Sequence, residues 1–308
     1  MFSYYGITEY NGKTIIMLLA PYTPFENAGA EYLPLDACYP CVHAAHMETK
    51  RLIAQLKNEG IEAEEFTEPV YSKLAMQAGL AYTKGRNSLT YNREFGSRFV
   101  LEAVAVSEMK CLRHEDMKPL TLIISALTSC CTATLHNFTS EAASYQNCSS
   151  CHMCIKACPV GAIGESGLTA DKCLRWHMRT GEYPSDEIAK KAGNAFWGCD
   201  ICQRVCPMNR KLQTANYKLQ IMPDDIKKLL KITDFLKSPK EHTEALGEYI
   251  GRNYANVNRL LALCINAAGN SGNKEYAPLI APYLESKSQT VKTAAERAAA
   301  QLYLPCGK

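Results

Sequence analysis

Eight cysteines lie between positions 148 and 206, and their spacing limits what this part of the chain can fold into. The first four form a C-x2-C-x2-C-x3-C-P run that begins at Cys148 and ends at Cys158-Pro159. The second group, from Cys199 to Cys206, lacks one internal cysteine, and Cys173 is the obvious replacement. Two-residue gaps let a tight loop turn three sulfur atoms inward around one centre.

The same order of cysteines holds two 4Fe-4S clusters in bacterial two-cluster ferredoxins, where the fourth cysteine of the run binds the other cluster. Each iron needs one thiolate, and this rule uses every thiolate of the array once. The stretch is therefore predicted to carry electrons. The predicted ligands of the first cluster are Cys148, Cys151, Cys154 and Cys206, and those of the second are Cys158, Cys173, Cys199 and Cys202.

Other uses of these cysteines fit less well. Four-cysteine zinc sites typically pair two C-x2-C knuckles and have no use for the longer run. Disulfides are disfavoured because nothing at the N-terminus resembles a secretory signal, and cytosolic thiols stay reduced. The remaining cysteines are expected to be structural thiols: Cys38, Cys41, Cys111, Cys130, Cys131, Cys264 and Cys306. For the adjacent residues Cys130 and Cys131, a redox role is the alternative.

The composition is that of an ordinary soluble globular protein. Hydrophobic residues make up 47% of the chain and charged residues 21%. Its length of 308 residues is enough for two or three domains. The apolar runs are far shorter than the ~20 residues that span a bilayer, so we expect a cytoplasmic protein with no membrane partner. The net charge of +3 is too small by itself to imply a polyanionic partner.

Hydrophobic patterning predicts a compact α/β part before the cysteine array and a helical part after it. Strands are expected at 14–19, 61–66 and 99–106, helices at 46–57 and 71–79, and a loop at 27–46. Beyond residue 207, apolar residues recur every three or four positions in 256–268 and 289–302, as in HEAT-type repeats. Because so few repeats cannot form a free-standing solenoid, we expect them to lean on the cluster domain.

Several segments together resemble one known family. Ala78-Gly-Leu80 is followed by Gly85-Arg-Asn-Ser-Leu89 and Asn92-Arg-Glu-Phe-Gly-Ser97, the array contains Gly198-Cys-Asp-Ile-Cys202, and Gly269-Asn-Ser-Gly272 precedes the last helix. In these segments the chain resembles the epoxyqueuosine reductases. Members of that family are cobalamin-dependent iron–sulfur enzymes that complete the queuosine modification at the wobble position of certain tRNAs.

The resemblance implies a cytoplasmic oxidoreductase of the α+β class in three parts. Residues 1–140 would form an α/β cobalamin-binding domain, 141–212 a ferredoxin-like double 4Fe-4S domain, and 213–308 a HEAT-like helical tail. It further implies two 4Fe-4S clusters, cobalamin, a tRNA substrate, and an external low-potential donor such as flavodoxin or ferredoxin. The cobalamin contacts that it implies are Arg86, Asn87, Ser88, Thr90, Asn92 and Ser97. Tyr22, after the first strand, could line the same pocket or be a core tyrosine at a strand end.

The family's proton donor is an aspartate ahead of a proline, and this chain has no aspartate there. Its segment is Glu64-Glu-Phe-Thr-Glu-Pro69. Counting back without gaps from Leu74 places Glu65 at the acid position, and a shift of one residue would favour Thr67 or Glu68. The predicted catalytic acids are therefore Glu65 and Glu68.

Other departures keep two alternative functions open. The helix and strand that the family usually has before the strand at Thr14 are expected to be missing, the loop at 27–46 departs from the family pattern, and 108–147 looks like an insertion. His43 and His46 near Cys38 and Cys41 could form a metal site, although scattered loop residues are the simpler interpretation. The alternatives are a corrinoid reductase with another substrate and a cluster-only electron-transfer protein.

Support for tRNA binding comes from basic residues beyond the array. Between Arg204 and Lys240 basic residues outnumber acidic ones, and Arg252, Arg259, Lys292 and Arg297 would extend the surface. A solvated helix face is the competing interpretation. Trp176 and Trp197 flank the second-cluster ligands and are expected to shield the cluster or pack in the core, with substrate stacking as the alternative.

Overall fold

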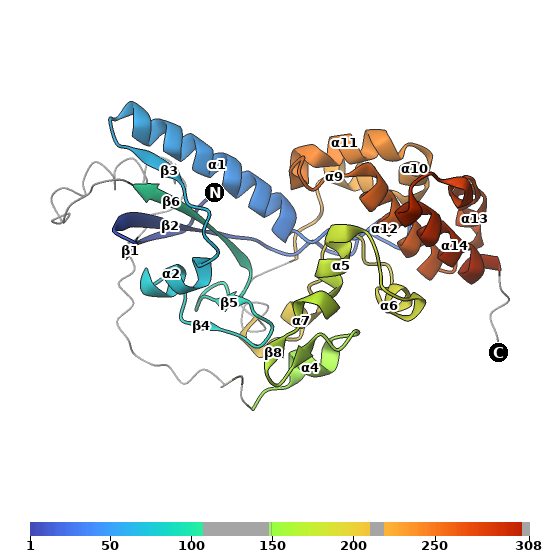
Figure 1. Ribbon diagram of the computed structural model, residues 1–308, viewed down its shortest axis with the longest axis horizontal. Coiled ribbons are helices and arrows are strands. Elements are labelled where there is room, and N and C mark those ends of the chain that lie inside the picture. The colour runs from blue at the N-terminus through green and yellow to red at the C-terminus, as the bar shows by residue number, and fades with distance from the viewer. Residues whose placement is uncertain (107–147, 149, 210–218, 304–308) are drawn as a thin grey trace. The chain divides into compact units, whose positions relative to one another are not determined.

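The computed structural model describes residues 1–106, 148, 150–209 and 219–303, which form two compact units (Figure 1). The first unit comprises Met1–Tyr22, Cys41–Cys151 and Pro207–Asn216. The second comprises Thr23–Pro40, His152–Cys206 and Tyr217–Lys308. Most of the cysteine array therefore shares a unit with the C-terminal helices. The predicted insertion at 108–147 and the thiols Cys111, Cys130, Cys131 and Cys306 lie outside the described residues.

A four-stranded antiparallel sheet organises the first unit, with strand order β1-β2-β6-β3. Its strands are β1 (Tyr4–Tyr10), β2 (Lys13–Pro21), β3 (Ala63–Glu65) and β6 (Phe99–Val106). Residues 15–20 of β2 are fully buried because the strand lies inside the sheet and is covered on both faces. The strands predicted at 14–19, 61–66 and 99–106 are confirmed.

A strand precedes β2, so the expectation that none would was wrong. β1 pairs with β2 from Tyr4 opposite Leu19 to Tyr10 opposite Lys13. The two turn residues, Asn11 and Gly12, have φ values of 50° and 76°. An Asn-Gly pair with both residues in the left-handed region suits the tight turn that matches the twist of a hairpin. The Asn-Gly pair was visible in the sequence.

Helices α1 (Cys38–Asn58) and α2 (Tyr71–Gln77) cover opposite faces of this sheet. Gly6, Met17 and Ala103 are paired across β1, β2 and β6. The end of α2 lies close to this row, because a Cβ on Gly6 would be 2.3 Å from the carbonyl oxygen of Ala78. Glu102 points from the other face of β6 toward α1. The helix predicted at 71–79 is confirmed.

Helix α1 begins at Cys38, eight residues before the predicted start, so the predicted loop at 27–46 was wrong over its last nine residues. Pro40 is tolerated there because the first turn of a helix needs no amide hydrogen from it. Buried residues then recur along one face as Ala45, Thr49, Leu52 and Leu56. His43 and His46 consequently lie on a helix.

The second unit combines short elements in the cysteine array with longer C-terminal helices. The array contains α4 (Met153–Ala157), β7 (Ile163–Gly164), β8 (Gly167–Leu168), α5 (Leu174–Thr180), α6 (Asp186–Lys191) and α7 (Ile201–Arg204). The C-terminal helices are α9 (Asp224–Lys227), α10 (Ile232–Lys237), α11 (Pro239–Ile250), α12 (Val257–Asn270), α13 (Ala277–Ile280) and α14 (Gln289–Tyr303). The helices predicted at 256–268 and 289–302 are confirmed.

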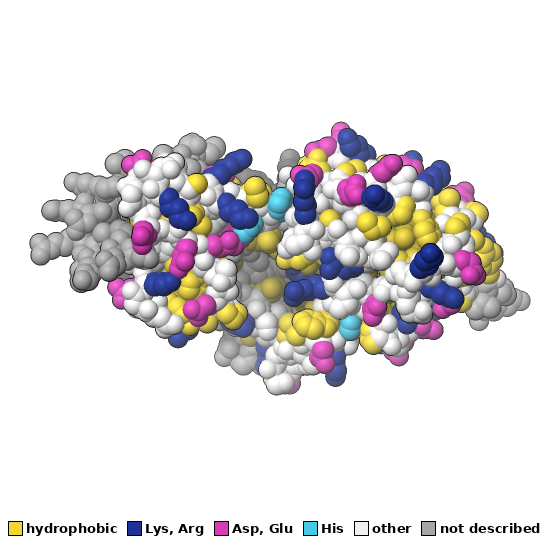
Figure 2. Space-filling model, turned by 45° about the horizontal axis from the view of Figure 1, so that its top comes forward, with side chains coloured by type: hydrophobic (Ala, Val, Ile, Leu, Met, Phe, Trp, Pro, Cys, Tyr) yellow, Lys and Arg dark blue, Asp and Glu magenta, His cyan; other side chains and the backbone are white. Residues whose placement is uncertain are grey.

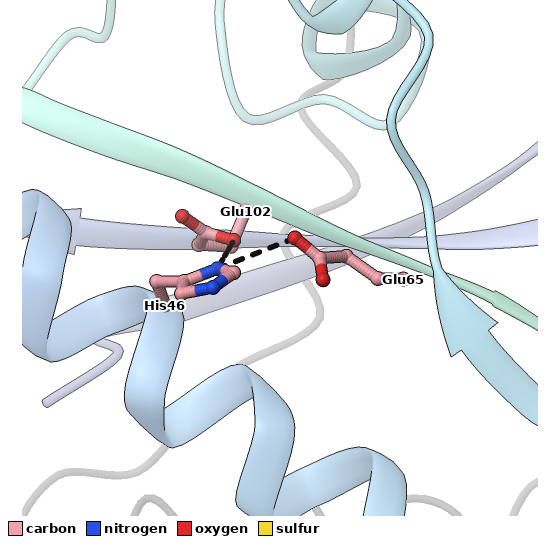
Figure 3. A group of neighbouring side chains, drawn as sticks. All are labelled: His46, Glu65 and Glu102. Carbon is pink, nitrogen blue, oxygen red and sulfur yellow. Dashed lines mark ion pairs between the residues drawn. The ribbon is translucent and has the colours of Figure 1, made fainter. Parts of the chain in front are cut away.

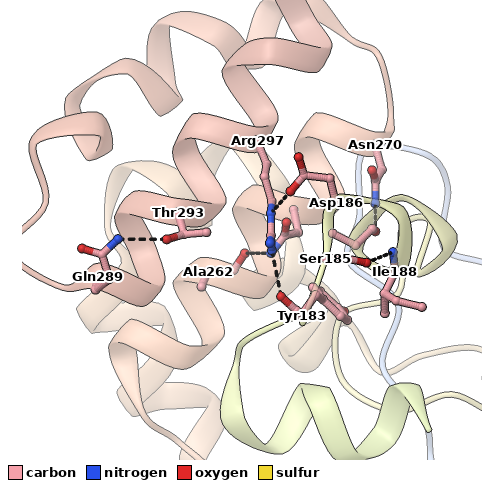
Figure 4. A network of polar contacts seen from close by, with 11 residues as sticks. Tyr183, Ser185, Asp186, Ile188, Ala262, Asn270, Gln289, Thr293 and Arg297 are labelled. Atoms are coloured by element: carbon pink, nitrogen blue, oxygen red, sulfur yellow. Dashed lines mark hydrogen bonds and ion pairs between the residues drawn. The ribbon is translucent and has the colours of Figure 1, made fainter. Parts of the chain in front are cut away.

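Helix α12 is the centre of this unit's core, and every residue from Leu260 to Gly269 is buried. The C-terminal helices lean on the cysteine array, as predicted, through polar contacts with its backbone (Figure 4). The Arg297 guanidinium contacts Asp186 Oδ1 at 2.6 Å and donates to the Tyr183 carbonyl at 3.1 Å. Asn270 donates to two carbonyl groups near α6.

Within the described ranges, no helix is both long enough and apolar enough to cross a lipid bilayer.

Candidate functional site

Two short helices of the array place its cysteines in equivalent positions. Cys154 is the second residue of α4 and Cys202 the second residue of α7. Cys158 comes directly after α4, and one residue separates Cys206 from the end of α7. Cys158 is extended, with ψ 112°, because the residue before a proline avoids the helical region. Each C-P pair therefore lies at the end of a short helix.

The thiols of the second unit lie close enough to influence one another. Burial, with Cys173 as a further cause, raises the pKa of Cys199 to about 11. Burial, with Cys199, Cys173 and Cys154 as further causes, raises the pKa of Cys202 to about 12. Buried thiols that repel each other as thiolates fit a cationic iron centre, which removes this penalty by binding them.

A backbone amide also points at one sulfur of the array. The Ala162 N–H donates to Cys158 Sγ at 3.2 Å, and such hydrogen bonds to ligand sulfur are typical of iron–sulfur sites. Cys148 and Cys151 belong to the first unit, where the Cys151 N–H donates to the Cys148 carbonyl. The division of the eight cysteines between two clusters stays a prediction.

Three titratable side chains meet on the α1 face of the sheet (Figure 3). His46 Nδ1 of α1 lies 3.3 Å from Glu65 Oε1 at the end of β3 and 3.8 Å from Glu102 Oε2 of β6. Among the described residues, this is the group whose metal-capable ligand atoms all lie within 4.8 Å of one another. The alternative of a metal site formed by His43 and His46 with Cys38 and Cys41 does not correspond to this group, which shares only His46 with it.

Glu102 is the most perturbed member of this group. Burial, and then repulsion from Glu65, raise the pKa of Glu102 to about 7. Burial, followed by Glu102 and Glu65, raises the pKa of the neighbouring Tyr71 to about 12. A carboxyl with a pKa near 7 can hold a proton at neutral pH and give it up. Sequence reasoning missed Glu102, although a carboxylate in an otherwise apolar strand was a visible signal.

The two predicted acids occupy different surroundings. Glu65 lies in the His46 group, with 38% of its side chain exposed. Glu68 lies on the exposed segment after β3, and its side chain bonds the hydroxyl of Tyr10, which raises the pKa of Tyr10. Of the two predicted acids, Glu65 is the one that lies beside an imidazole and a second carboxyl.

The predicted cobalamin contacts divide into buried residues and accessible ones. Asn87 donates to the Tyr91 hydroxyl, Asn92 donates to the Leu80 carbonyl, and Ser97 bonds Asn209. These three are at most 5% exposed, so they fix the shape of the loop at 85–97.

The remaining predicted contacts have more exposed positions. Ser88 has φ 61° and is exposed, and Arg86 lies beside it with its guanidinium 3.5 Å from the Cys151 carbonyl. Thr90 Oγ1 bonds Ser72 Oγ at 2.7 Å, and Tyr22 is half-buried with its amide on the Arg98 carbonyl. The loop is thus preformed by its own hydrogen bonds, as sites for rigid ligands usually are.

The structure separates the two tryptophans. Trp197 is 1% exposed and packs against Tyr39 and Tyr254, as the core interpretation predicted. Trp176 is 47% exposed with Arg179 over its ring, so core packing was wrong for this residue. The expected core thiols Cys41 and Cys264 are buried, and burial raises the pKa of Cys264.

Many predicted tRNA-binding cations have partners within the protein. Arg297 joins two parts of the second unit, Arg259 donates to three carbonyl groups, and Arg252 pairs with Glu248 at 2.9 Å. On the face drawn in Figure 2, basic side chains are interspersed with acidic ones. Of the predicted run, Arg210, Lys211 and Lys218 lie outside the described residues. For the described cations, the structure therefore supports the interpretation of a solvated helix face more than that of a stripe that binds tRNA phosphates.

Known proteins share this array. Residues 147–209 match a family described as a 4Fe-4S double cluster binding domain. An epoxyqueuosine reductase of Staphylococcus aureus is 33% identical over 179 residues, and one of Bacillus subtilis is 44% identical over 64 residues. Over these segments the chain is similar to the epoxyqueuosine reductases. The two matches cover 58% and 20% of this chain but only 39% and 17% of those proteins, so the chain aligns with less than half of either relative.

Solved structures of this family share its fold. The epoxyqueuosine reductase of Streptococcus thermophilus superposes with a TM-score of 0.68 at 19% identity, covering 94% of this chain and 74% of that one. An epoxyqueuosine reductase bound to an epoxyqueuosine-modified tRNA-Tyr stem loop superposes with a TM-score of 0.52 at 18% identity, covering 94% and 82%. The fold is thus that of the solved epoxyqueuosine reductases, and the family match over residues 147–209 supports iron–sulfur clusters as cofactors.

Proposed function

We propose that this chain is a cobalamin-dependent iron–sulfur reductase that converts epoxyqueuosine to queuosine at the wobble position of tRNA. The observation that carries the proposal is the match to the Staphylococcus aureus epoxyqueuosine reductase, which extends well beyond the cysteine array. The proposed substrate would place the protein in the cytoplasm.

Removing an epoxide oxygen as water consumes two electrons and two protons and leaves a carbon–carbon double bond. When bound, the clusters supply single electrons and the corrinoid supplies the cobalt chemistry that acts on the epoxide. The eight cysteines hold the clusters, and an external low-potential protein such as flavodoxin or ferredoxin delivers the electrons. The chain's other task is to orient the substrate and supply protons.

Glu65 is the proposed proton donor, with Glu102 and His46 as its supply. The 38% exposure of the Glu65 side chain lets it reach a substrate, whereas Glu102 at 12% stays behind it. Because Glu102 has a pKa of about 7, it holds a proton near neutral pH, and His46 contacts both carboxylates. A glutamate does the work of the family's aspartate here only if its longer side chain is accommodated.

The loop at 85–97 is the proposed corrinoid contact. Asn87, Asn92 and Ser97 shape it from inside, which leaves Arg86 and Ser88 as the proposed direct contacts, flanked by Thr90 and Tyr22. Arg86 keeps the charge of the family's lysine but changes its geometry. The helices from α9 onward are the proposed HEAT-like tail, and tRNA binding is assigned to its basic residues that lack a described ion pair, such as Lys292.

Anaerobic reconstitution with iron, sulfide and cobalamin tests the cofactors. The desalted protein is expected to retain about eight irons and one cobalt, measured by metal analysis and absorption spectroscopy. It is then incubated with epoxyqueuosine tRNA and a reducing system, and nucleosides from digested tRNA are measured by mass spectrometry. Appearance of queuosine supports the proposal, and irons without retained cobalt would contradict it in favour of a two-cluster electron carrier.

A corrinoid reductase with a different substrate is the second candidate. It is favoured by the absence of the family aspartate and by the limited coverage of the curated relatives. Full loading with iron and cobalt, together with no conversion and no binding of epoxyqueuosine tRNA, would decide for it.

A further inference from the structure

The segment before helix α1 lies directly against the two residues that precede Cys199. Leu35 and Trp197 form a parallel bridge, and the Asp36 N–H donates to the Trp197 carbonyl at 2.9 Å. Gly198 has φ 101°, and a Cβ there would lie 2.4 Å from Asp36 Cβ and 3.0 Å from a ring carbon of Tyr39. Asp36 and Tyr39 thus pack directly against the backbone that carries Cys199.

Arg175 reaches the same two residues from the other cysteine-bearing segment. It lies two residues after Cys173, at the start of α5. Its guanidinium is 3.5 Å from Asp36 Oδ2, 3.9 Å from Cys38 Sγ and 5.1 Å from the centre of the Tyr39 ring. Asp36 is 6% exposed in its side chain, so the ion pair is largely shielded from water.

Arg175 therefore sits as a fixed positive charge between the segments of two predicted ligands, Cys173 and Cys199. Arg175 follows Cys173 by two residues, and its partner Asp36 bonds the backbone of Trp197, two residues before Cys199. Reduction adds one negative charge to a cluster, and a nearby cation stabilises the reduced form. Net charge around a cluster is one of the factors that set its potential.

We infer that Arg175, held in place by Asp36 and Tyr39, is a positioning residue that raises the reduction potential of the cluster bound by Cys158, Cys173, Cys199 and Cys202. This cluster would accept an electron more readily than it would without the guanidinium. The step is the gain of one electron from a reductant, and no bond forms or breaks. The inference rests on the double-cluster domain alone and holds for any substrate.

The test is an anaerobic redox titration of the reconstituted full-length protein with dithionite, followed by electron paramagnetic resonance. Arg175→Gln removes the charge, and one of the two clusters is expected to titrate at a lower potential. At a fixed potential the ratio of reduced to oxidised cluster falls about tenfold, equivalent to about 59 mV for a one-electron couple. Arg175→Lys, which keeps the charge without the planar fork, is expected to lie between Arg175→Gln and wild type.

Arg179→Gln is the matched control, because Arg179 lies one turn further along α5 over the exposed ring of Trp176. Its midpoints are expected to equal those of wild type. Unchanged midpoints in fully loaded Arg175→Gln protein would overturn the inference, since a purely structural role would lower iron content without moving the potential of the loaded fraction.

Asp36→Asn carries the test if Arg175→Gln fails to hold iron. It removes the negative charge and leaves a side chain of the same shape beside the guanidinium, so the midpoint of the same cluster is expected to rise. An unchanged or lower midpoint contradicts the inference. Turnover of epoxyqueuosine tRNA is not used, so failure of the proposed function leaves this result interpretable.

Discussion

Glu102 is the residue whose environment changes its chemistry most. It lies in β6 between Leu101 and Ala103, where the strand alternation turns it toward His46 and Glu65. Water would keep its carboxyl ionised at neutral pH, but burial and the nearby Glu65 raise its pKa to about 7. The residue can therefore be protonated at the pH of a cell.

Stability should respond to this shift. A pKa raised in the folded state gives a contribution that is fully present below the unfolded value, near 4.5, and is lost as the pH rises through about 7. As the pH rises between those values, the free energy of unfolding of the wild type should fall by up to about 3 kcal/mol relative to that of Glu102→Gln. Urea unfolding at about pH 4.5 and about pH 8 measures this difference. Glu62→Gln, at an exposed position, is the control and should follow wild type.

Glu65→Gln tests the proton donor. The substituted amide keeps the size of the side chain but cannot donate a carboxyl proton, so both clusters should load normally while turnover falls about 100-fold or more. Iron analysis and queuosine formation are measured on the same preparation. Glu68→Gln is the matched variant and should keep turnover. Unchanged turnover in Glu65→Gln would move the role to Glu68 or to solvent.

At the scale of elements, helices α12 and α14 of the second unit pack closely against each other. Gly269 of α12 faces Ala298 of α14, and a Cβ on the glycine would lie 2.7 Å from both Cα and Cβ of that alanine. Helices can approach this closely only where one residue has no side chain. The sequence showed the apolar spacing of both helices but not which residue makes the contact.

Gly269→Ala should therefore destabilise the protein by about 1–3 kcal/mol, because the helices must move apart. The clash is with backbone, which cannot rotate away as a long side chain can. Denaturant unfolding followed by circular dichroism measures the change. Gly164→Ala is the comparison, since nothing lies within 4 Å of its added Cβ, and an equal loss in both variants would contradict the packing argument.

For the molecule as a whole, the main structural result is that the C-terminal helices and most of the cysteine array form one unit. Arg297 is 15% exposed in its side chain and connects α14 with Asp186 and the carbonyl of Tyr183. These contacts join segments more than 100 positions apart. The tail thus supports the segment that holds the clusters.

Arg297→Met should lower stability by about 1–3 kcal/mol, because the methionine leaves the Tyr183 carbonyl without its donor. Iron should also be lost faster from the variant when a chelator is added, since the array loses part of its support. Arg252→Met removes only an exposed pair with Glu248 and should change stability by less than about 0.5 kcal/mol. Identical iron release from both variants would argue against this support.

The sequence by itself predicted the double-cluster array and the main strands and helices, and it showed the resemblance to the epoxyqueuosine reductases. Thiol spacing is a local property, because a two-residue gap fixes how far apart two sulfur atoms can lie. Apolar periodicity is local too, so the strands β2 and β6 and the helices α12 and α14 followed from it.

Only the tertiary structure decided which distant residues meet. His46, Glu65 and Glu102 come together because α1 crosses one face of the sheet, and Asp36 reaches Arg175 because the segment before α1 lies beside Trp197. The environment of Glu102 and the position of Arg175 depend on burial and on charges far away in the chain. Sequence spacing cannot supply them, because the pKa of a carboxyl and the field of a guanidinium depend on distances in space.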